Sequence, residues 1–199
     1  MAKPTKFNRS EVIHKAMLLY WQKGFHATSM RCLQDAIDMR PGSIYAEFGS
    51  KEGLFKAAIE HYSEQGMTRL DELVKQSSSP IQGLKAFILQ SVEPCGTDNP
   101  NAMCMLAKTV SELTEDNDEL LQLARYSLKA NEAKLAEVIA KAQSIGEVNP
   151  ELSPMRLAQH LKIQIMGIKT YIHATACSQA QTRALIEELF SGPLFKHQQ

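Results

Sequence analysis

Several features that mark whole classes of protein are missing from this chain of 199 residues. No apolar run approaches the roughly 18 residues that a membrane-spanning helix needs, and the N-terminal part lacks the apolar segment of a signal peptide. The four cysteines, at positions 32, 95, 104 and 177, form no CxxC pair, so reduced thiols are expected. The sequence therefore predicts a cytoplasmic protein without a membrane partner or a disulfide framework.

Metal and cofactor chemistry also lack a signal in the sequence. The six histidines are scattered, with neither H-x3-H nor HExxH spacing. No stretch alternates polar and apolar residues with a period of two, and no glycine-rich phosphate loop follows a strand. A helical enzyme would need a nucleophile, a base or metal ligands that converge, and no such set stands out. We therefore expect no enzyme, no cofactor and no metal site.

The formal net charge is zero, but the charges are unevenly distributed. Residues 1–56 carry an excess of four positive charges, and residues 57–199 carry an excess of four negative charges. A basic N-terminal part favours a polyanionic partner, because lysine and arginine neutralise phosphates and release condensed counterions. Such an excess is also common in proteins that bind no nucleic acid, so charge alone leaves the partner open.

The N-terminal third contains residues that typically begin and end helices. Asn8 is placed to cap a first helix, with Glu11 reaching back in a capping box, and Gly24 marks its C-terminal end. Thr28 is placed to cap a short second helix. Pro41 suits the first turn of a third helix, because its missing N–H needs no partner there. These signals predict three helices in succession.

Further signals divide the rest of the chain into helices. Gly49 ends the third helix and Ser50 caps the fourth. Residues 93–101 contain proline, glycine and asparagine and are predicted to form a loop. Later helices are expected to begin at Pro80, near Leu120, at Pro154 and before Leu185. The whole pattern predicts an all-α protein of roughly nine helices.

Residues 28–48 combine two short helices around a turn of about three residues. This is the helix-turn-helix arrangement, which places its second helix in the major groove of DNA. The segments VIHKAMLLYWQKGFHATSMRCL and RPGSIYAEFGSKEGLFKAAIEHY resemble the N-terminal domain of the TetR/AcrR family of transcriptional regulators. The resemblance covers roughly residues 8–62 and implies a three-helix DNA-binding domain.

The family motif G-x-x-Y-x-x-F, followed by K-E-x-L, stands at the end of the third helix. Here its members are Gly42, Tyr45 and Phe48, followed by residues 51–54. Gly42 leaves room for backbone to approach the duplex, and Tyr45 can place its hydroxyl on a phosphate. Phe48 is expected to pack in the core against the first and fourth helices, and core packing remains an alternative for Tyr45.

Three positions depart from the family pattern. Gln34 stands where a small alanine is usual, and Asp38 replaces the glycine of the turn. Aspartate tolerates the left-handed conformation, so the turn is expected to survive. Arg40 stands where a capping serine or threonine is common. Its guanidinium is then placed at the groove, where arginine pairs with guanine O6 and N7.

Phosphate contacts are expected at the starts of helices, where free N–H groups attract anions. Lys51 adds a cation at the start of the fourth helix, and Thr28 and Ser29 offer hydroxyls at the second. The candidate DNA-binding residues are Thr28, Ser29, Arg40, Pro41, Gly42, Ser43, Tyr45 and Lys51.

The resemblance also implies that residues 1–56 form the DNA-binding domain and residues 57–199 a helical domain that binds a ligand and dimerises through its last two helices. Residues 155–176 are apolar on more than one side, and Gly167 would let another helix approach closely. A core helix of a monomer is the alternative. The candidate dimer-interface residues are Leu157, Leu161, Ile165, Ile168, Ile172, Leu185 and Leu189.

The segment NAMCMLAKTVSEL is similar to one family branch in which a cysteine precedes an apolar helix. Cys104, with Lys108 one turn along, could be a thiol sensor, because a nearby cation lowers a thiol pKa. Met166 is a further candidate for contact with the ligand. The alternative is a buried, inert Cys104 beside a pocket for a noncovalent ligand.

Together these features predict a ligand-responsive transcriptional repressor that binds a palindromic operator as a homodimer. Its expected partners are double-stranded operator DNA, a second copy of the chain and a small-molecule effector of unknown identity. The alternative function is a helical protein-interaction module that binds no DNA and uses its basic face on an acidic surface.

Overall fold

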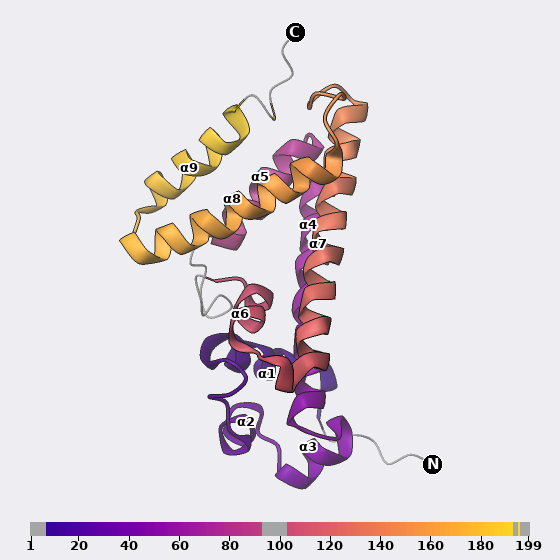
Figure 1. Cartoon of the computed structure of the whole chain (residues 1–199), viewed down its shortest axis with the longest axis vertical. Coiled ribbons are helices and arrows are strands. Elements are labelled where there is room, and N and C mark those ends of the chain that lie inside the picture. The colour runs from indigo at the N-terminus through magenta and orange to yellow at the C-terminus, as the bar shows by residue number, and fades with distance from the viewer. Residues whose placement is uncertain (1–6, 93–102, 193–194, 196–199) are drawn as a thin grey trace. The chain divides into compact units, whose positions relative to one another are not determined.

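A computed structural model describes residues 7–92, 103–192 and 195 of the chain. This described part contains nine α-helices, a 3-10 turn at Glu115–Asn117 and no strand, which confirms the all-α prediction (Figure 1). The helices are α1 (Arg9–Lys23), α2 (Met30–Ile37), α3 (Pro41–Phe48), α4 (Lys51–Gln76), α5 (Pro80–Val92), α6 (Met105–Glu112), α7 (Asp118–Ser144), α8 (Pro154–Thr175) and α9 (Gln179–Ser191). The loop predicted at residues 93–101 lies outside the described residues.

The start of α1 follows the predicted signal with one difference. The Asn8 side chain accepts hydrogen bonds from the N–H groups of Ser10 (3.1 Å) and Glu11 (3.4 Å) and so caps the helix. The predicted return contact of Glu11 is wrong, because its carboxylate instead lies 2.7 Å from the Lys15 ammonium one turn along α1. Gly24 ends the helix with φ +89°, a conformation that glycine adopts without strain.

The predicted cap at Ser50 is present, and two further serines cap the helices whose starts were predicted at Pro80 and Pro154. Ser50, Ser79 and Ser153 each accept a hydrogen bond from an N–H in the first turn of the helix that follows. Ser178 forms a full capping box at α9 that the sequence interpretation did not include. Each hydroxyl satisfies a donor that the helix itself leaves unpaired.

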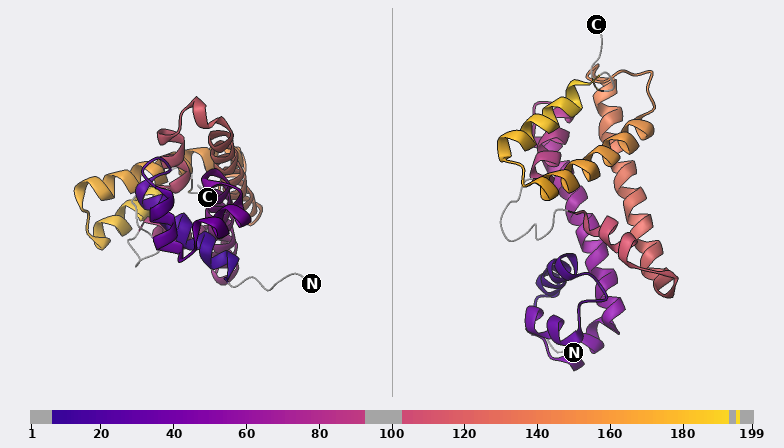
Figure 2. Two further views of the ribbon diagram at one scale, coloured as in Figure 1. Left: turned by 90° about the horizontal axis from the view of Figure 1, so that it is seen from below. Right: turned by 60° about the vertical axis from the view of Figure 1, so that its left-hand side comes forward.

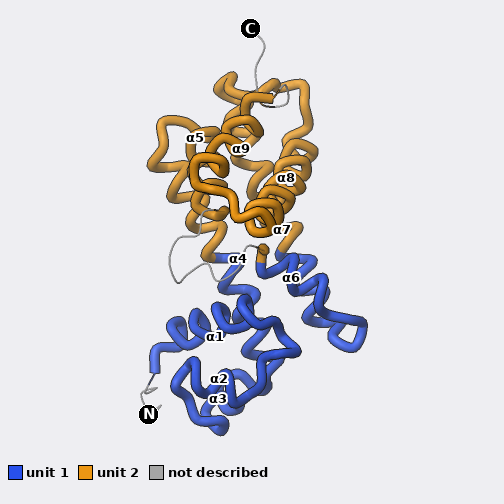
Figure 3. Tube along the Cα trace, turned by 90° about the vertical axis from the view of Figure 1, so that its left-hand side faces the viewer, with its two compact units in different colours: residues 1–64, 105–127 blue, residues 65–104, 128–199 orange. Residues whose placement is uncertain are grey.

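The chain divides into two compact units, shown in Figure 3. Unit 1 consists of residues 1–64 and 105–127, and unit 2 consists of residues 65–104 and 128–199. Both α4 and α7 contribute to both units, and α6 belongs to unit 1. The functional boundary expected at residue 56 stays a prediction, because the units are defined by packing. Within the described part of the chain, no helix is long and apolar enough to cross a membrane.

Unit 1 is built around a cluster of aromatic rings. Tyr20 and Phe55 meet edge to face with ring centroids 4.7 Å apart, and Phe25 lies 4.9 Å from Phe55. All three are buried, and the Tyr20 hydroxyl donates to the carbonyl of Lys51 at 3.1 Å. Burial raises the pKa of Tyr20 well above its usual value, and the charge of Glu52 adds to the shift. The hydroxyl therefore stays protonated as a donor that joins α1 to α4.

Unit 2 has an aliphatic core contributed by α4, α5, α7, α8 and α9. The right-hand view of Figure 2 shows α5, α8 and α9 packed together. Gly83 permits a close approach of α5 to α4, since a Cβ there would lie 2.5 Å from the Cα of Val74. Lys85 joins α5 to α9 through an ion pair of 2.9 Å with Glu187.

Candidate nucleic-acid interface

The predicted helix-turn-helix is confirmed in unit 1. The turn between α2 and α3 depends on Asp38, which adopts the left-handed conformation with φ +51°. Leu33 of α2 and Ile44 of α3 are fully buried, and Met39, which lies in the turn between the two helices, is also buried. These apolar side chains fix both short helices onto the core, so that the opposite faces remain exposed.

The exposed face of α3 carries most of the candidate DNA-binding residues. Arg40, Pro41, Gly42 and Ser43 are all exposed, and Tyr45 is 50% exposed. Arg40 is the N-cap residue but makes no side-chain cap hydrogen bond, which leaves the guanidinium available. A Cβ placed on Gly42 would meet no atom within 4 Å, so this side of the helix is open to a close approach.

Phe48, which was predicted to pack in the core against the first and fourth helices, is only half-buried. Ile44 is the fully buried side chain of this helix, whereas Phe48 is half-buried with the Arg9 guanidinium 5.5 Å from its ring centroid. Arg9 also donates from Nε to Oε1 of Glu47 at 2.8 Å. Sequence reasoning missed Arg9 because its partners lie 38 or more positions along the chain, which no local pattern reveals.

The start of α2 corrects the role of Thr28. Ser29, not Thr28, is the N-cap residue and accepts from the N–H of Cys32 at 3.2 Å. Thr28 is fully buried, and its hydroxyl donates to the carbonyl of Gly24 at 2.6 Å. Because this side chain is used inside the unit, Thr28 is removed from the candidate phosphate contacts, while the exposed Ser29 remains.

Cys32 is a feature of this surface that sequence reasoning missed. The Ser29 hydroxyl lies 3.2 Å from its sulfur, and the Lys23 ammonium lies 3.9 Å away. The hydrogen bonds from Ser29 lower the pKa of the Cys32 thiol, and the charge of Lys23 acts in the same direction. The half-exposed thiol therefore has more thiolate character than an ordinary cysteine.

Lys51 lies at the predicted helix start but is engaged with an aromatic ring. Its ammonium is 4.2 Å from the ring centroid of Phe25, and the residue is half-buried. Burial lowers its pKa, while the carboxylates of Glu52 and Glu112 oppose that shift. Its contact with a phosphate stays a prediction.

The predicted partnership of Lys108 with Cys104 is wrong. Lys108 Nζ donates to the carbonyls of Trp21 (2.9 Å) and Gln22 (2.8 Å), at the C-terminal end of α1. The cation near Cys104 is Lys169 of α8: burial lowers the pKa of Lys169, and the charge of Cys104 opposes that shift. A long side chain thus finds its partners 86 and 87 positions away instead of one turn along its own helix.

The candidate dimer-interface residues divide into two groups. Leu157, Leu161 and Ile165 are buried in the core of unit 2, so the prediction that they contact a second chain is wrong. Four other residues are half-buried and remain candidates: Ile168, Ile172, Leu185 and Leu189. The exposed apolar residues of α8 lie on a different face: Met155, Ile163, Met166 and Tyr171.

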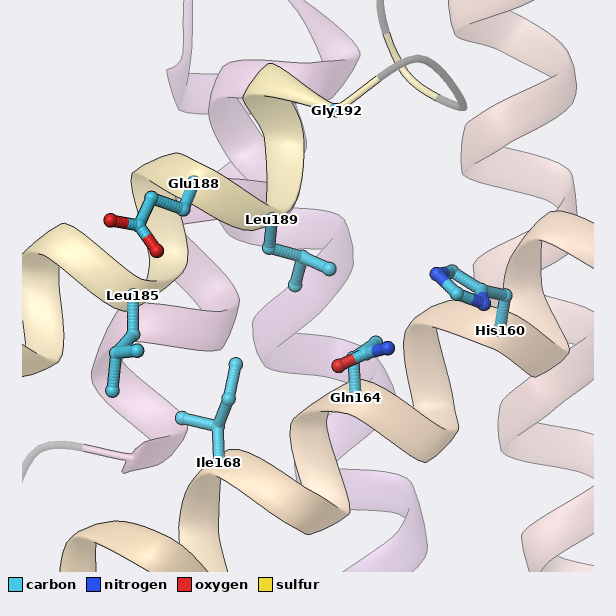
Figure 4. A pocket seen from close by; sticks show the side chains of 7 residues that line it. All are labelled: His160, Gln164, Ile168, Leu185, Glu188, Leu189 and Gly192. Atoms are coloured by element: carbon cyan, nitrogen blue, oxygen red, sulfur yellow. The ribbon is translucent and has the colours of Figure 1, made fainter.

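A groove of about 360 Å³ lies between α8 and α9. In Figure 4, Gln164 and Ile168 of α8 point toward Leu185 and Leu189 of α9. The lining residues are His160, Gln164, Ile168, Leu185, Glu188, Leu189 and Gly192. Met166 is not among them, and its predicted contact with a ligand stays a prediction.

Comparison with protein families finds a match in the part of the chain that contains the helix-turn-helix. The model of the bacterial regulatory proteins of the tetR family matches residues 12–58, which include α2, α3 and the turn between them. The match therefore covers the exposed residues from Arg40 to Tyr45.

Two repressors of Escherichia coli (strain K12) are similar in sequence. The HTH-type transcriptional repressor ComR is 27% identical over 168 residues, which span 83% of this chain and 80% of ComR. The HTH-type transcriptional repressor BdcR is 40% identical over 108 residues, which span 54% of this chain and 55% of BdcR. The similarity to ComR extends well beyond the helix-turn-helix.

Solved structures share the fold. A cysteine mutant of the TetR family regulator CifR, complexed with 26-bp double-strand operator DNA, has a TM-score of 0.81 at 22% identity and covers 96% of this chain and 99% of its own. The reduced form of NemR from E. coli has a TM-score of 0.73 at 19% identity, covering 92% of this chain and 95% of NemR. Both units therefore have counterparts of known structure.

Proposed function

We propose that this chain, which belongs to the TetR family of bacterial regulatory proteins, is a transcriptional repressor that binds an operator through α2 and α3. The observation that carries the proposal is the exposed face of α3, where Arg40, Gly42 and Tyr45 lie on a helix anchored from behind by Ile44. The proposed place of action is the cytoplasm, where operator DNA is found.

The exposed groups divide into base and phosphate contacts. Arg40 begins the helix that would enter the major groove, where a guanidinium pairs with guanine O6 and N7. Ser29, Ser43 and Tyr45 present hydroxyls that suit phosphate oxygens. Open space around Gly42 lets the backbone of α3 approach the duplex. Arg40 would then determine sequence preference, and the hydroxyls would fix the register.

A homodimer is the proposed binding form, because one short helix contacts too few base pairs to specify an operator. Ile163 is 68% exposed and Tyr171 55% exposed on one face of α8, and a Cβ on Gly167 between them would meet nothing within 4 Å. A second copy of α8 could therefore approach this face closely. The half-buried Leu185 and Leu189 lie beside the α8–α9 groove, on a different face from Ile163, and stay separate candidates for a contact with the second copy.

Unit 2 is the proposed effector-binding part, with a small molecule that releases the operator. Cys104 is its candidate chemical sensor, because the half-exposed thiol interacts electrostatically with the Lys169 side chain. The competing mechanism is a noncovalent ligand with an inert Cys104. Either agent would act only by binding two states of the dimer with different affinities.

Selection of binding sites from random DNA tests the proposed function directly. The selected sequences are expected to be two-fold symmetric, and binding to the selected duplex is expected to weaken steeply as salt rises. Asymmetric sites, or binding that ignores salt, would contradict a dimeric operator-binding protein. No selectable site at all would favour the protein-interaction module instead.

The sensor role of Cys104 is tested by treatment with N-ethylmaleimide. The Cys32→Ser background is needed, because the Cys32 thiol also has a lowered pKa and lies beside the proposed interface. In that background the reagent is expected to release the selected duplex, and a further Cys104→Ser change should abolish the release. Retained DNA binding after treatment, or equal release with Cys104→Ser, would remove Cys104 from the mechanism.

A further inference from the structure

Two charged side chains of α6 hold the segment that joins α1 to α2. Lys108 and Glu112 stand one helical turn apart on the same helix. Lys108 donates to the Trp21 and Gln22 carbonyls at 2.9 and 2.8 Å. The two oxygens of Glu112 accept from the N–H groups of Phe25 (3.1 Å) and His26 (2.8 Å). All of these residues belong to unit 1.

The charges match the polarity of the groups that they contact. The carbonyls at the C-terminal end of α1 carry partial negative charge, so an ammonium stabilises them. The N–H groups of Phe25 and His26, which follow Gly24, donate hydrogen bonds to the carboxylate. Hydrogen bonds to charged groups are stronger than those between neutral groups. Four such bonds therefore fix both sides of the chain reversal.

Gly24 makes this arrangement possible. Its φ of +89° produces the reversal, and a Cβ at this position would lie only 2.4 Å from a carboxylate oxygen of Glu112. The carbonyl of Gly24 accepts a hydrogen bond from the hydroxyl of Thr28. Thr28 is buried and stands just before the first turn of α2. Phe25 is buried between these residues with Lys51 over its ring. Three sets of contacts thus hold the segment from Gly24 to Thr28: those of Glu112 on α6, the hydrogen bond between Thr28 and Gly24 within the segment, and the contact of Lys51 on α4 with Phe25.

We infer that Lys108 and Glu112 are positioning residues for DNA binding: they set the angle between α1 and α2 and make α6 part of the framework that orients α2 and α3. The inference rests on the proposed operator binding. Neither side chain needs to touch DNA, because their bonds act on the backbone from Trp21 to His26.

The experiment compares binding to two duplexes: one selected from random DNA by the wild-type protein and one of scrambled sequence. Lys108→Met and Glu112→Gln each remove the charge from two hydrogen bonds, and each is expected to weaken binding to the selected duplex about tenfold or more. Binding to the scrambled duplex should change much less, because phosphate contacts tolerate a changed helix angle. The salt dependence should remain that of the wild type, since no phosphate contact is removed.

Lys108→Arg keeps a cation at the carbonyls and is expected to restore the ratio of selected to scrambled binding. Matched controls are Lys129→Met and Glu151→Gln, which alter exposed charges of unit 2 and should leave the ratio unchanged. The exchange Lys108→Glu with Glu112→Lys preserves net charge but points each charge at the wrong backbone group, so the ratio should stay low. This double variant separates positioning from simple charge.

A ratio that stays at the wild-type value in folded Lys108→Met and Glu112→Gln variants would overturn the inference, whatever their melting temperatures. Circular dichroism and thermal unfolding identify which variants are folded under the binding conditions. If the single variants unfold, Lys108→Arg and the double exchange supply the same comparison. Failure of the wild-type protein to select any duplex would contradict the proposed function instead.

Discussion

The helices α3 and α8 begin in the same way and serve different surfaces. Both have proline at their first position, but Ser153 before α8 accepts a hydrogen bond from the first turn, whereas Arg40 before α3 makes none. A serine cap stabilises a helix by about 1 kcal/mol relative to an uncapped start. The chain forgoes that stabilisation at α3, where the exposed guanidinium of Arg40 is the proposed base contact.

The exposed faces of the two helices also differ: that of α3 is polar and that of α8 is apolar. The face of α3 presents a guanidinium, a hydroxyl and an open glycine, whereas α8 presents Ile163, Met166 and Tyr171. Exposed apolar groups that gather on one face mark a protein contact, and cationic and hydroxyl groups suit phosphates and bases. The comparison therefore supports the proposal that α3 contacts DNA and that α8 contacts a second copy of the chain.

The largest expected effect distinguishes the two faces of α8. Leu161→Ala should lower the free energy of unfolding by about 2–5 kcal/mol, because the side chain is fully buried in the core. Ile163→Asp, two positions along on the exposed face, should instead raise the dissociation constant of the dimer about thirtyfold or more. Chemical unfolding and analytical ultracentrifugation measure the two quantities.

Protein concentration provides the control for this prediction. Dimer formation stabilises by mass action, so the stability lost in Ile163→Asp should depend on protein concentration, whereas that lost in Leu161→Ala should persist at every concentration. An Ile163→Asp protein that remains dimeric at low concentration would place the interface on another surface.

The next largest effect is expected from changing the N-cap residues of α3 and α8. Arg40→Ser should reduce discrimination between selected and mismatched duplexes by about 1–3 kcal/mol and raise the free energy of unfolding by about 0.5–1 kcal/mol. Ser153→Ala should lower the free energy of unfolding by about 1 kcal/mol and leave discrimination unchanged. Titrations with both duplexes and urea unfolding test both variants. Unaltered discrimination in Arg40→Ser would show that the guanidinium touches no base.

A smaller effect is expected from Lys51, which stands at the start of α4. Lys51→Met keeps the apolar stem over Phe25 and removes the charge. If the ammonium contacts a phosphate, all duplexes should bind more weakly and the slope of log K against log salt should become less steep by about one. Binding to selected and scrambled duplexes over a range of salt decides this. An unchanged slope would show that the ammonium serves only the ring contact.

The sequence predicted local features well because their causes are local. The cap at Asn8, the left-handed Asp38, Pro41 at the start of α3 and the uncapped Arg40 depend on neighbours within a few positions. Backbone geometry and hydrogen-bonding capacity at those positions leave few alternatives. Three helices and the exposed surface of α3 follow from these signals.

Contacts between distant segments could not be predicted in the same way. Helical periodicity shows which residues share a face but not what that face packs against, so the stripe containing Leu161 was assigned to a dimer and proved to be core. Lys108 was paired with a neighbour on its own helix, yet its flexible stem reaches the carbonyls of α1. Glu112 and Arg9 gave no local signal, because their partners are 38 to 87 positions away.

The smallest expected effect concerns acid and the unit that carries α3. His61 of α4 and His14 of α1 meet edge to face with ring centroids 5.6 Å apart. The buried Nε2 of His61 has no hydrogen-bond partner among the described residues. Burial lowers the pKa of His61, the charge of His14 acts in the same direction, and Glu64 opposes them. The folded protein therefore favours the neutral imidazole.

The sign of the pH dependence follows from this preference. An unfolded histidine titrates near pH 6.5, so the stabilisation from a neutral His61 is complete above that pH and is lost as the pH falls through the lower folded-state pKa. His61→Leu should remove this component and flatten the loss of stability as the pH falls below about 6.5. Thermal unfolding at a series of pH values measures it, with His173→Leu on the exposed face of α8 as the matched control. Equal pH dependence in wild-type and His61→Leu proteins would show that the histidine pair does not oppose protonation, and acid would then have no selective effect on the helices that hold α3.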